Sequence, residues 1–161
     1  MMRVYIPNMS EGEGIVVKIK TRDGVRIPEY ATEDASCMDI RAFLGSPNAS
    51  LTINPGETKA IPTGIFFEVP SGYEIVVRPR SGLALDYGIT VLNSPGTIDA
   101  DFRGEVKIIL HNTSNRPFII HDGDRIAQIA LQKVHRIKLK RVSRLSKTQR
   151  GSKGIGSTGI D

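Results

Sequence analysis

The segment Asn93–Glu105 reads NSPGTIDADFRGE, and it decides the fold assignment. Its polar and apolar side chains alternate at the period of a half-buried strand, so one strand with a solvated face would explain the pattern. Turn-forming residues stand at both ends, at Asn93, Pro95, Gly96 and Gly104. We therefore predict a hairpin bent near positions 96–101 in place of a long straight strand.

The rest of the chain consists mainly of short runs rich in Val and Ile, which are typical of strands. Turn residues separate these runs, as at positions 54–56 and 122–124. Close, even spacing of many short strands is typical of barrels and double-sheet jelly rolls. We predict an all-β, single-domain, jelly-roll-like β-barrel with one helical turn at Ser81–Tyr87. The predicted strands are Ile15–Lys20, Met38–Leu44, Ser50–Ile53, Thr58–Pro62, Gly64–Val69, Glu74–Arg78, Val106–Asn112, Phe118–Ile120, Arg125–Val134 and Arg136–Val142.

Length and composition favour one intracellular domain. With 161 residues, the chain is long enough to bury a core without metal or disulfide staples. The single cysteine, Cys37, cannot form an intrachain disulfide, and the N-terminal residues lack the apolar core of a secretory signal. No apolar run approaches the ~18 residues that a membrane helix requires. We expect a soluble, cytoplasmic protein that does not contact membranes.

The positive charge of the chain is concentrated near its C-terminus. The net charge is +5, with 22 Lys and Arg against 17 Asp and Glu. Residues 133–153 hold nine of the 22 basic residues and no acidic one, which leaves 13 basic against 17 acidic residues elsewhere, a net charge of −4. Such a basic run either contacts phosphates, on a polymer or on a nucleotide, or is a solvated linker.

These features divide the chain into three parts. We predict an N-terminal extension (1–14), a jelly-roll body (15–142) and a basic, glycine-rich C-terminal arm (143–161). The last residues of the arm, 151–159, contain too much glycine to pack a core. They form either a disordered end or a segment whose backbone N–H groups approach phosphate oxygens.

Four further segments place polar groups where they need partners. Asp39 is flanked by apolar residues, where an unpaired carboxylate is costly, and Gln128 lies within an apolar run. The segment 78–82 reads RPRSG and brings two guanidinium groups and a hydroxyl into a tight turn, and Arg150 precedes the glycine-rich tail. Taken singly, these features are better explained as a salt-bridged strand carboxylate, an edge-facing amide, a capped turn and a surface arginine.

The order of these segments resembles the five motifs of the trimeric deoxyuridine triphosphatase family, the dUTP diphosphatases (dUTPases). The matching segments are Asp39 with its neighbours, 79–84, 96–105, 123–128 and 150–159, and the resemblance runs from about Val16 to Gly159. It implies a jelly-roll subunit in a homotrimer with three sites at subunit boundaries. Each site would take its first, second and fourth motifs from one subunit, its third from a neighbour and its fifth from the remaining arm.

The reaction implied by this resemblance is the hydrolysis of dUTP to dUMP and pyrophosphate with Mg²⁺. That activity limits uracil incorporation into DNA and supplies dUMP for thymidylate synthesis. Asp99 resembles the general base that activates water for attack on the α-phosphorus, and Asp39 resembles the carboxylate that holds Mg²⁺ through water. The residues expected to take part in catalysis are Asp99, Gln128 and Arg80. The residues expected to bind substrate are Arg80, Ser81, Gly82, Asn93, Gly96, Thr97, Ile98, Asp99, Phe102, Gln128, Arg150, Gly154, Ile155, Gly156, Ser157 and Thr158.

Two residues depart from the family pattern. Phe102 stands where the family usually has tyrosine, so the ring that excludes a ribose 2′-hydroxyl is kept and only the phenolic hydroxyl is lost. Ile155 replaces the aromatic residue that stacks on uracil. An aromatic pair contributes roughly 0.5–1.5 kcal/mol beyond its area burial, and this contribution is absent here.

Two other functions compete with this one. A dCTP deaminase shares the jelly roll, but its motifs include a second serine after the Arg-Ser pair and a glutamate in the strand that follows the third motif; here Gly82 follows Ser81, and residues 109–112 contain no glutamate. A non-enzymatic β-module would bind nucleic acid through the arm. The negative body and the lack of aromatic residues in the arm argue against that, so we expect no direct nucleic acid binding.

Overall fold

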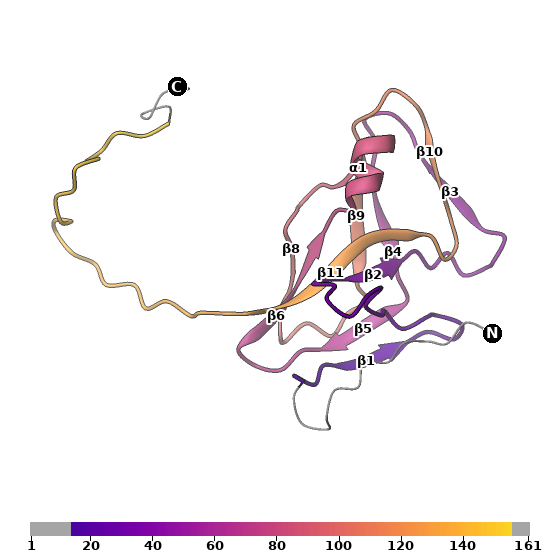
Figure 1. Ribbon diagram of the computed structural model, residues 1–161, viewed down its shortest axis with the longest axis horizontal. Helices are drawn as coiled ribbons and strands as arrows, with labels where there is room; N and C mark the ends of the chain where they lie inside the picture. The colour runs from indigo at the N-terminus through magenta and orange to yellow at the C-terminus, as the bar shows by residue number, and fades with distance from the viewer. Residues whose placement is uncertain (1–13, 156–161) are drawn as a thin grey trace.

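A computed structural model describes residues 14–155, in which strands dominate and one short helix is present (Figure 1). The elements are β1 (Lys18–Thr21), β2 (Met38–Arg41), β3 (Ser50–Ile53), β4 (Thr58–Pro62), β5 (Ile65–Glu68), β6 (Tyr73–Arg78), α1 (Ser81–Tyr87), β7 (Ile89–Val91), β8 (Gly96–Ile98), β9 (Lys107–Asn112), β10 (Phe118–His121) and β11 (Arg125–Lys133). The all-β prediction and the single helix at Ser81–Tyr87 are confirmed.

The strands of this part of the chain form four antiparallel sheets. The largest has the order β2-β11-β6-β8, and the next has the order β4-β9-β7. Two strand pairs, β1-β5 and β10-β3, complete the body. Neighbours in each sheet are mostly far apart in sequence, as jelly rolls require, and the described strands are not joined into one hydrogen-bonded ring.

The core lies between the inner faces of these sheets and consists almost entirely of branched aliphatic side chains. Alternation along each strand explains it: in β9, for example, every second residue is buried, in a pattern that ends at Asn112. The largest fully buried apolar residues are Ile40, Ile53, Ile61, Ile65, Ile89, Ile108, Leu110, Ile120, Ile126 and Ile129. This packing holds the ends of β2, β6, β8 and β11 in place.

The predicted hairpin in the opening segment is wrong, although a turn does begin within the predicted bend, where the N–H of Phe102 donates to the carbonyl oxygen of Asp99. β7 pairs with β9 and β8 pairs with β6, so the chain crosses from one sheet to another between Val91 and Gly96. The turn that makes this crossing contains a cis peptide bond between Ser94 and Pro95. Alternation and turn residues locate a bend, but they do not specify which strands pair on either side of it.

The predicted strand at Arg136–Val142 is also wrong. The last strand, β11, ends at Lys133, and residues 135–155 are exposed and extend away from the body (Figure 1). Their apolar side chains have no neighbour to pack against, with Ile137, Leu139 and Leu145 each at least 80% exposed. Alternating basic and apolar residues produced the strand prediction, but a strand forms only where another strand accepts its hydrogen bonds.

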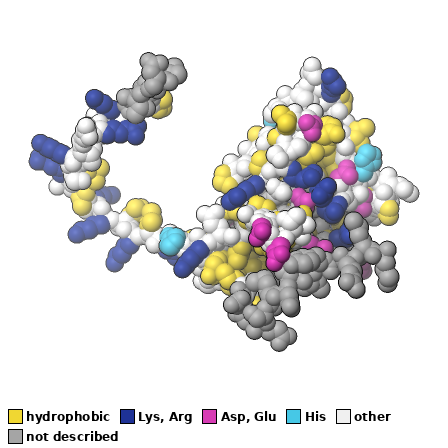
Figure 2. Space-filling model, in the orientation of Figure 1, with side chains coloured by type: hydrophobic (Ala, Val, Ile, Leu, Met, Phe, Trp, Pro, Cys, Tyr) yellow, Lys and Arg dark blue, Asp and Glu magenta, His cyan; other side chains and the backbone are white. Residues whose placement is uncertain are grey.

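Lys and Arg side chains lie along the extended segment of residues 135–155 (Figure 2).

No helix in residues 14–155 is long and apolar enough to cross a membrane.

Candidate active site

Three strands bring separate polar segments to one level of the largest sheet. In the register of this sheet Asp39 on β2 lies opposite Gln128 on β11, and Gln128 lies opposite Arg78 on β6. Arg80 lies two residues after the end of β6 and is the residue that precedes α1. Antiparallel pairing therefore brings together residues from three distant parts of the sequence, which belong to the first, second and fourth of the motif-like segments.

Asp39 is the centre of this group, which we call the arginine cluster (Asp39, Arg41, Arg80, Arg125 and Gln128). Its Oδ1 lies 3.3 Å from Nε of Arg80 and accepts a hydrogen bond from Nε2 of Gln128 at 3.4 Å. Its Oδ2 accepts a hydrogen bond from Nη1 of Arg125 at 3.0 Å. The Asp39 side chain is 15% exposed, so these partners compensate for the burial of its charge. The expectation that Asp39 and Gln128 need partners is confirmed.

The arginine cluster carries more positive than negative charge. Burial, together with the nearby Arg26, Arg125 and Arg80, lowers the pKa of Arg41, while the Asp39 carboxylate opposes that shift. Arg41 also donates from Nη1 to the carbonyl oxygen of Gly123 at 2.7 Å, which holds its side chain in place. A half-buried group of guanidinium groups around one carboxylate is an environment that attracts a polyanion.

Arg41 and Arg125 were not among the predicted site residues. Arg41 is two residues after Asp39 on the same strand, so strand alternation alone would have placed both on one face. Nothing in the sequence pattern indicated the position of the Arg125 side chain, because the register of β11 against β2 shifts between Arg125 and Ala127. Simple alternation does not predict the direction of a side chain beside such an irregularity.

Arg80 links the arginine cluster to the start of α1. Its Nη1 donates to the carbonyl oxygen of Arg125 at 3.0 Å, so its side chain is fixed from two sides. Ser81 and Gly82, both predicted to bind substrate, form the exposed first turn of α1 beside it. The helix ends at Tyr87 and is capped by Gly88, whose φ of 66° lies in the left-handed region that favours glycine.

A second group of predicted residues lines a pocket of about 390 Å³ beside the turn between β7 and β8, which we call the β8 pocket. Asn93, Gly96, Thr97, Ile98, Asp99 and Phe102 all contribute to its wall. Gly96 is needed here because a Cβ atom would lie 3.2 Å from Cβ of Val77 and 3.3 Å from Nδ2 of Asn93. The pocket is mainly apolar with a few polar groups, which is the usual composition of a small-molecule site.

The loop after β8 carries Asp99 and Phe102. Its backbone is held by a hydrogen bond from the N–H of Phe102 to the carbonyl oxygen of Asp99, at 3.1 Å. Arg103 donates from Nη1 to the carbonyl oxygens of Ala100 and Phe102, at 2.7 and 2.9 Å. The Phe102 ring is 44% exposed, so one side of it is available for contact.

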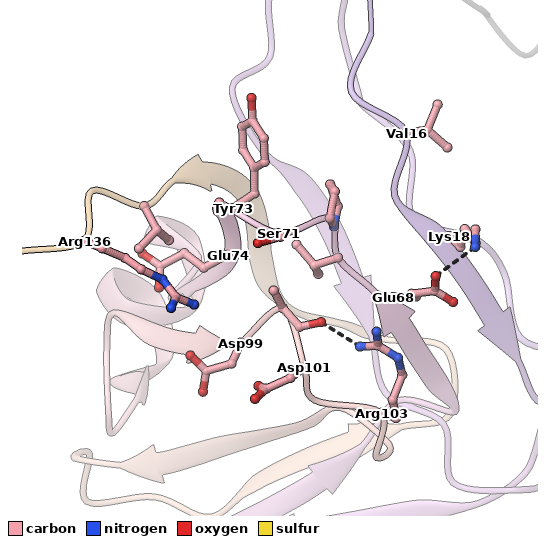
Figure 3. Close-up of a pocket in the computed structure, with 15 residues that line it drawn as sticks. Val16, Lys18, Glu68, Ser71, Tyr73, Glu74, Asp99, Asp101, Arg103 and Arg136 are labelled. Carbon is pink, nitrogen blue, oxygen red and sulfur yellow. Dashed lines mark hydrogen bonds and ion pairs between the residues drawn. The ribbon is translucent and has the colours of Figure 1, made fainter.

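Asp99 lies at the boundary between the β8 pocket and a larger one of about 800 Å³. Figure 3 shows the larger pocket, with Asp99 and Asp101 on the loop after β8, Glu74 on β6, and Arg136 on the segment after β11. A carboxylate in this place is accessible both to a ligand in the β8 pocket and to water, as a general base must be.

The two groups of residues lie at opposite corners of the same sheet. Asp39 is on edge strand β2 and Asp99 follows edge strand β8, three strand spacings of about 4.8 Å apart. Along the strands, Asp39 is level with Arg78, whereas Ile98 is level with Ile75. With about 3.3 Å per residue, the backbones at Asp39 and Asp99 are roughly 19 Å apart. A single chain therefore does not bring the arginine cluster and the β8 pocket together.

The predicted residues of the arm lie apart from both groups. Arg150 donates from Nε to the carbonyl oxygen of Lys153 at 3.0 Å and from Nη2 to that of Gly154 at 3.4 Å. Ile155 is fully exposed. Gly156, Ser157 and Thr158 lie outside the described residues.

The donor set for a metal is small. Residues 14–155 contain no group of three or more His, Cys, Asp or Glu side chains arranged to hold an ion. Asp39 already interacts with three nitrogen donors, and a carboxylate offers about four acceptor positions. One remaining position fits a water molecule of a hydrated Mg²⁺ ion, which keeps several waters and takes most direct ligands from phosphates.

Comparisons with known proteins agree on one family. The dUTPase family profile matches residues 23–159. A protein of Caldanaerobacter subterraneus subsp. tengcongensis named deoxyuridine 5′-triphosphate nucleotidohydrolase is 48% identical over 149 residues, which cover 91% of this chain and 99% of that protein. A protein of Bdellovibrio bacteriovorus with the same name is 50% identical over 147 residues, which cover 90% of this chain and 97% of that protein.

Solved structures show the same fold at lower sequence identity. The dUTPase of Staphylococcus bacteriophage 80α with dUpNHpp has a TM-score of 0.79 and 23% identity, covering 90% of this chain and 99% of the phage chain. A mutant dUTPase of the S. aureus phage phi11, described as showing the coordination of a structural Mg(II) ion, has a TM-score of 0.72 and 19% identity, covering 82% and 99%.

Proposed function

The chain belongs to the dUTPase family, and from this premise we propose that it is a dUTP diphosphatase, hydrolysing dUTP to dUMP and pyrophosphate. The β8 pocket is the structural observation that best supports this function. Asn93, Gly96 and Phe102 line a small apolar space there, and Asp99 lies at its rim. Its volume of about 390 Å³ suits a nucleoside.

The β8 pocket binds the nucleoside in this proposal. Asn93 and the backbone from Gly96 to Ile98 read the edge of uracil, in a slot without room for the methyl group of thymine. Gly96 supports this role, because even one Cβ atom there would press on Asn93 and Val77. The Phe102 ring lies against deoxyribose and excludes a 2′-hydroxyl.

Asp99 activates the attacking water in this proposal. As the general base it accepts a proton while the water oxygen forms a bond to the α-phosphorus and the bond to the pyrophosphate oxygen breaks. Gln128 and Arg80 orient the phosphates and the water, and their fixed contacts to Asp39 keep them pre-organised. Ser81, Gly82, Arg150, Gly154, Ser157 and Thr158 add phosphate contacts, and Ile155 covers the base.

In this proposal Asp39 lies near the phosphates of the substrate and contacts Mg²⁺ only through water. When bound, Mg²⁺ neutralises and aligns the phosphate oxygens. The three nitrogen donors on Asp39 support the water-mediated role, because they occupy most of its acceptor positions and leave one for a water molecule of the hydrated ion. The same donors give Asp39 a second task, which is to hold Arg80 and Gln128 toward the substrate.

We further propose that the enzyme is a homotrimer whose sites are shared between subunits. The roughly 19 Å between Asp39 and Asp99 supports this, because a general base must lie within hydrogen-bond reach of a water that itself touches the phosphorus. The exposed apolar side chains of the segment that follows β11, Ile137, Leu139 and Leu145, also support it, since another subunit can cover them.

In the cell the proposed activity limits uracil incorporation into DNA and supplies dUMP for thymidylate synthesis, in the cytoplasm. In this proposal the chain has three parts: an extension (1–14), a catalytic body (15–142) and an arm (143–161). The arm closes over bound nucleotide.

A nucleotide panel tests the function. Pyrophosphate and ammonia release are measured with dUTP, dTTP, dCTP and UTP, each with and without Mg²⁺. We expect pyrophosphate from dUTP alone, stimulated by Mg²⁺. Ammonia from dCTP would identify a deaminase instead, and no turnover combined with salt-dependent polynucleotide binding would identify a nucleic-acid-binding module.

A further inference from the structure

The loop that carries Asp99 and Phe102 is anchored at its far end by a carboxylate that has no role in the proposed mechanism. Oε1 of Glu105 accepts the backbone N–H of Gly64 at 2.9 Å, and Oε2 accepts a hydrogen bond from Nη2 of Arg22, also at 2.9 Å. The Glu105 side chain is 14% exposed, whereas the Arg22 side chain is 56% exposed. Glu105 thus ties the loop to the β4–β5 connection and to the residue that follows β1.

The chain next to Glu105 continues this attachment. The N–H of Val106 donates to the carbonyl oxygen of Ile65 at 2.8 Å, and the buried Thr63 hydroxyl donates to the carbonyl oxygen of Val106 at 2.7 Å. Residues 105 and 106 are therefore held against the 63–65 segment by backbone and side-chain contacts together. Of these contacts, the pair between Glu105 and Arg22 is the one that joins two charged groups.

The anchor reaches the Phe102 ring through Gly104. A Cβ atom at Gly104 would lie 2.6 Å from Cζ and 2.9 Å from Cε2 of Phe102, so the ring rests directly on the Gly104 backbone. Gly104 is bonded to Glu105, and its position follows that of Glu105. Asp99 is five residues before Phe102's support at Gly104, and the hydrogen bond from Phe102 N–H and the two Arg103 contacts fix the backbone of residues 99–103, so the anchor acts first on the ring.

We infer that Glu105 is a positioning residue for sugar selection: its contacts with Gly64 and Arg22 hold Gly104 where the Phe102 ring excludes a ribose 2′-hydroxyl. The inference rests on the proposed function, and it assigns Glu105 and Arg22 a task in specificity that is separate from turnover. Because exclusion of one hydroxyl depends on sub-ångström placement of the ring, a loosened anchor should admit ribonucleotides before it slows the chemistry.

The test compares the kcat/KM of the full-length protein for dUTP with that for UTP. Glu105→Gln keeps the shape of the side chain and one acceptor but removes the charge that holds Arg22. We expect the dUTP-to-UTP ratio to fall about tenfold while kcat for dUTP stays within about twofold. Arg22→Met, at a mostly exposed position, should lower the ratio in the same direction, and Arg22→Lys should restore part of it.

Glu57→Gln is the matched control. Glu57 also combines a backbone contact, from the N–H of Asn54 at 2.7 Å, with an ion pair to Lys59 at 3.1 Å, but it lies at the β3–β4 turn and touches neither pocket-lining loop. Its variant should keep the wild-type ratio. Wild-type ratios in both Glu105→Gln and Arg22→Met, with dUTP turnover intact, would overturn the inference alone. A wild-type protein that releases no pyrophosphate from dUTP would overturn the proposed function itself.

Discussion

Replacing Asp39 by asparagine removes the negative charge at the centre of the arginine cluster while keeping the side-chain shape. Three nitrogen donors face this carboxylate, from Arg80, Arg125 and Gln128. Asparagine can accept from only one side, and its amide then turns N–H groups toward a guanidinium. We therefore expect Arg80 to lose its fixed orientation in the Asp39→Asn variant.

The magnitude follows from the exposure of the partners. A hydrogen bond to a charged group contributes about 1.5–3 kcal/mol net. Because the Arg80 and Arg125 side chains are 25% and 47% exposed, water replaces part of what is lost, and the lower end of that range applies. A loss of about 1.5–2 kcal/mol in transition-state binding corresponds to a roughly 10- to 30-fold lower kcat/KM.

The assay measures kcat/KM for dUTP at saturating Mg²⁺, beside urea unfolding. Glu68→Gln is the control, since it makes the same charge change in the Lys18–Glu68 pair, whose side chains are 72% and 47% exposed, and it should stay within about twofold of the wild type. Saturating Mg²⁺ should not rescue Asp39→Asn. Recovery of wild-type kcat/KM at high Mg²⁺ would refute the argument that Asp39 holds Arg80, because Asp39 would then act through the ion alone.

Substitutions at three other residues test the general base, the contact with uracil and the core. Asp99→Asn should keep dUTP binding in equilibrium titrations and lose turnover by about 10²-fold or more; near-normal turnover would remove Asp99 from the role of base. Ile155→Phe should lower KM for dUTP by restoring an aromatic contact with uracil, and an unchanged or higher KM would show that Ile155 does not cover the base. Asn112→Ala should lower the free energy of unfolding by about 3 kcal/mol in urea titrations, because the fully buried amide donates to two carbonyl oxygens and accepts two hydrogen bonds from Ser114; a loss below about 1 kcal/mol would contradict this.

Local patterns predicted much of the fold and part of the site. Runs of Val and Ile between turn residues located most strands, and Ser81–Tyr87 is helical as expected. The need of an apolar-flanked carboxylate and amide for partners was also visible, and Asp39 and Gln128 do interact with each other. These predictions succeeded because burial and alternation act within a few residues.

Long-range pairing was not predictable in the same way. A bend near positions 96–101 was expected, but nothing local indicated that β8 would pair with β6 and β7 with β9. The strand expected at Arg136–Val142 lacks a partner within the described part of the chain. Arg125 and Glu105 were not recognised, since their importance comes from contacts with residues 86 and 83 positions away.

Complementation between two inactive variants tests directly whether each site is shared between subunits. Asp99→Asn and Arg80→Met subunits are coexpressed with different tags, and assemblies carrying both tags are assayed with dUTP. If each site combines the β8 pocket of one subunit with the arginine cluster of another, every trimer that carries both tags has one intact site of three, and we expect about a third of wild-type activity. Activity no higher than that of either variant alone would contradict the shared site. Each active site would then be formed within one subunit, and every subunit would carry one of the two inactivating substitutions.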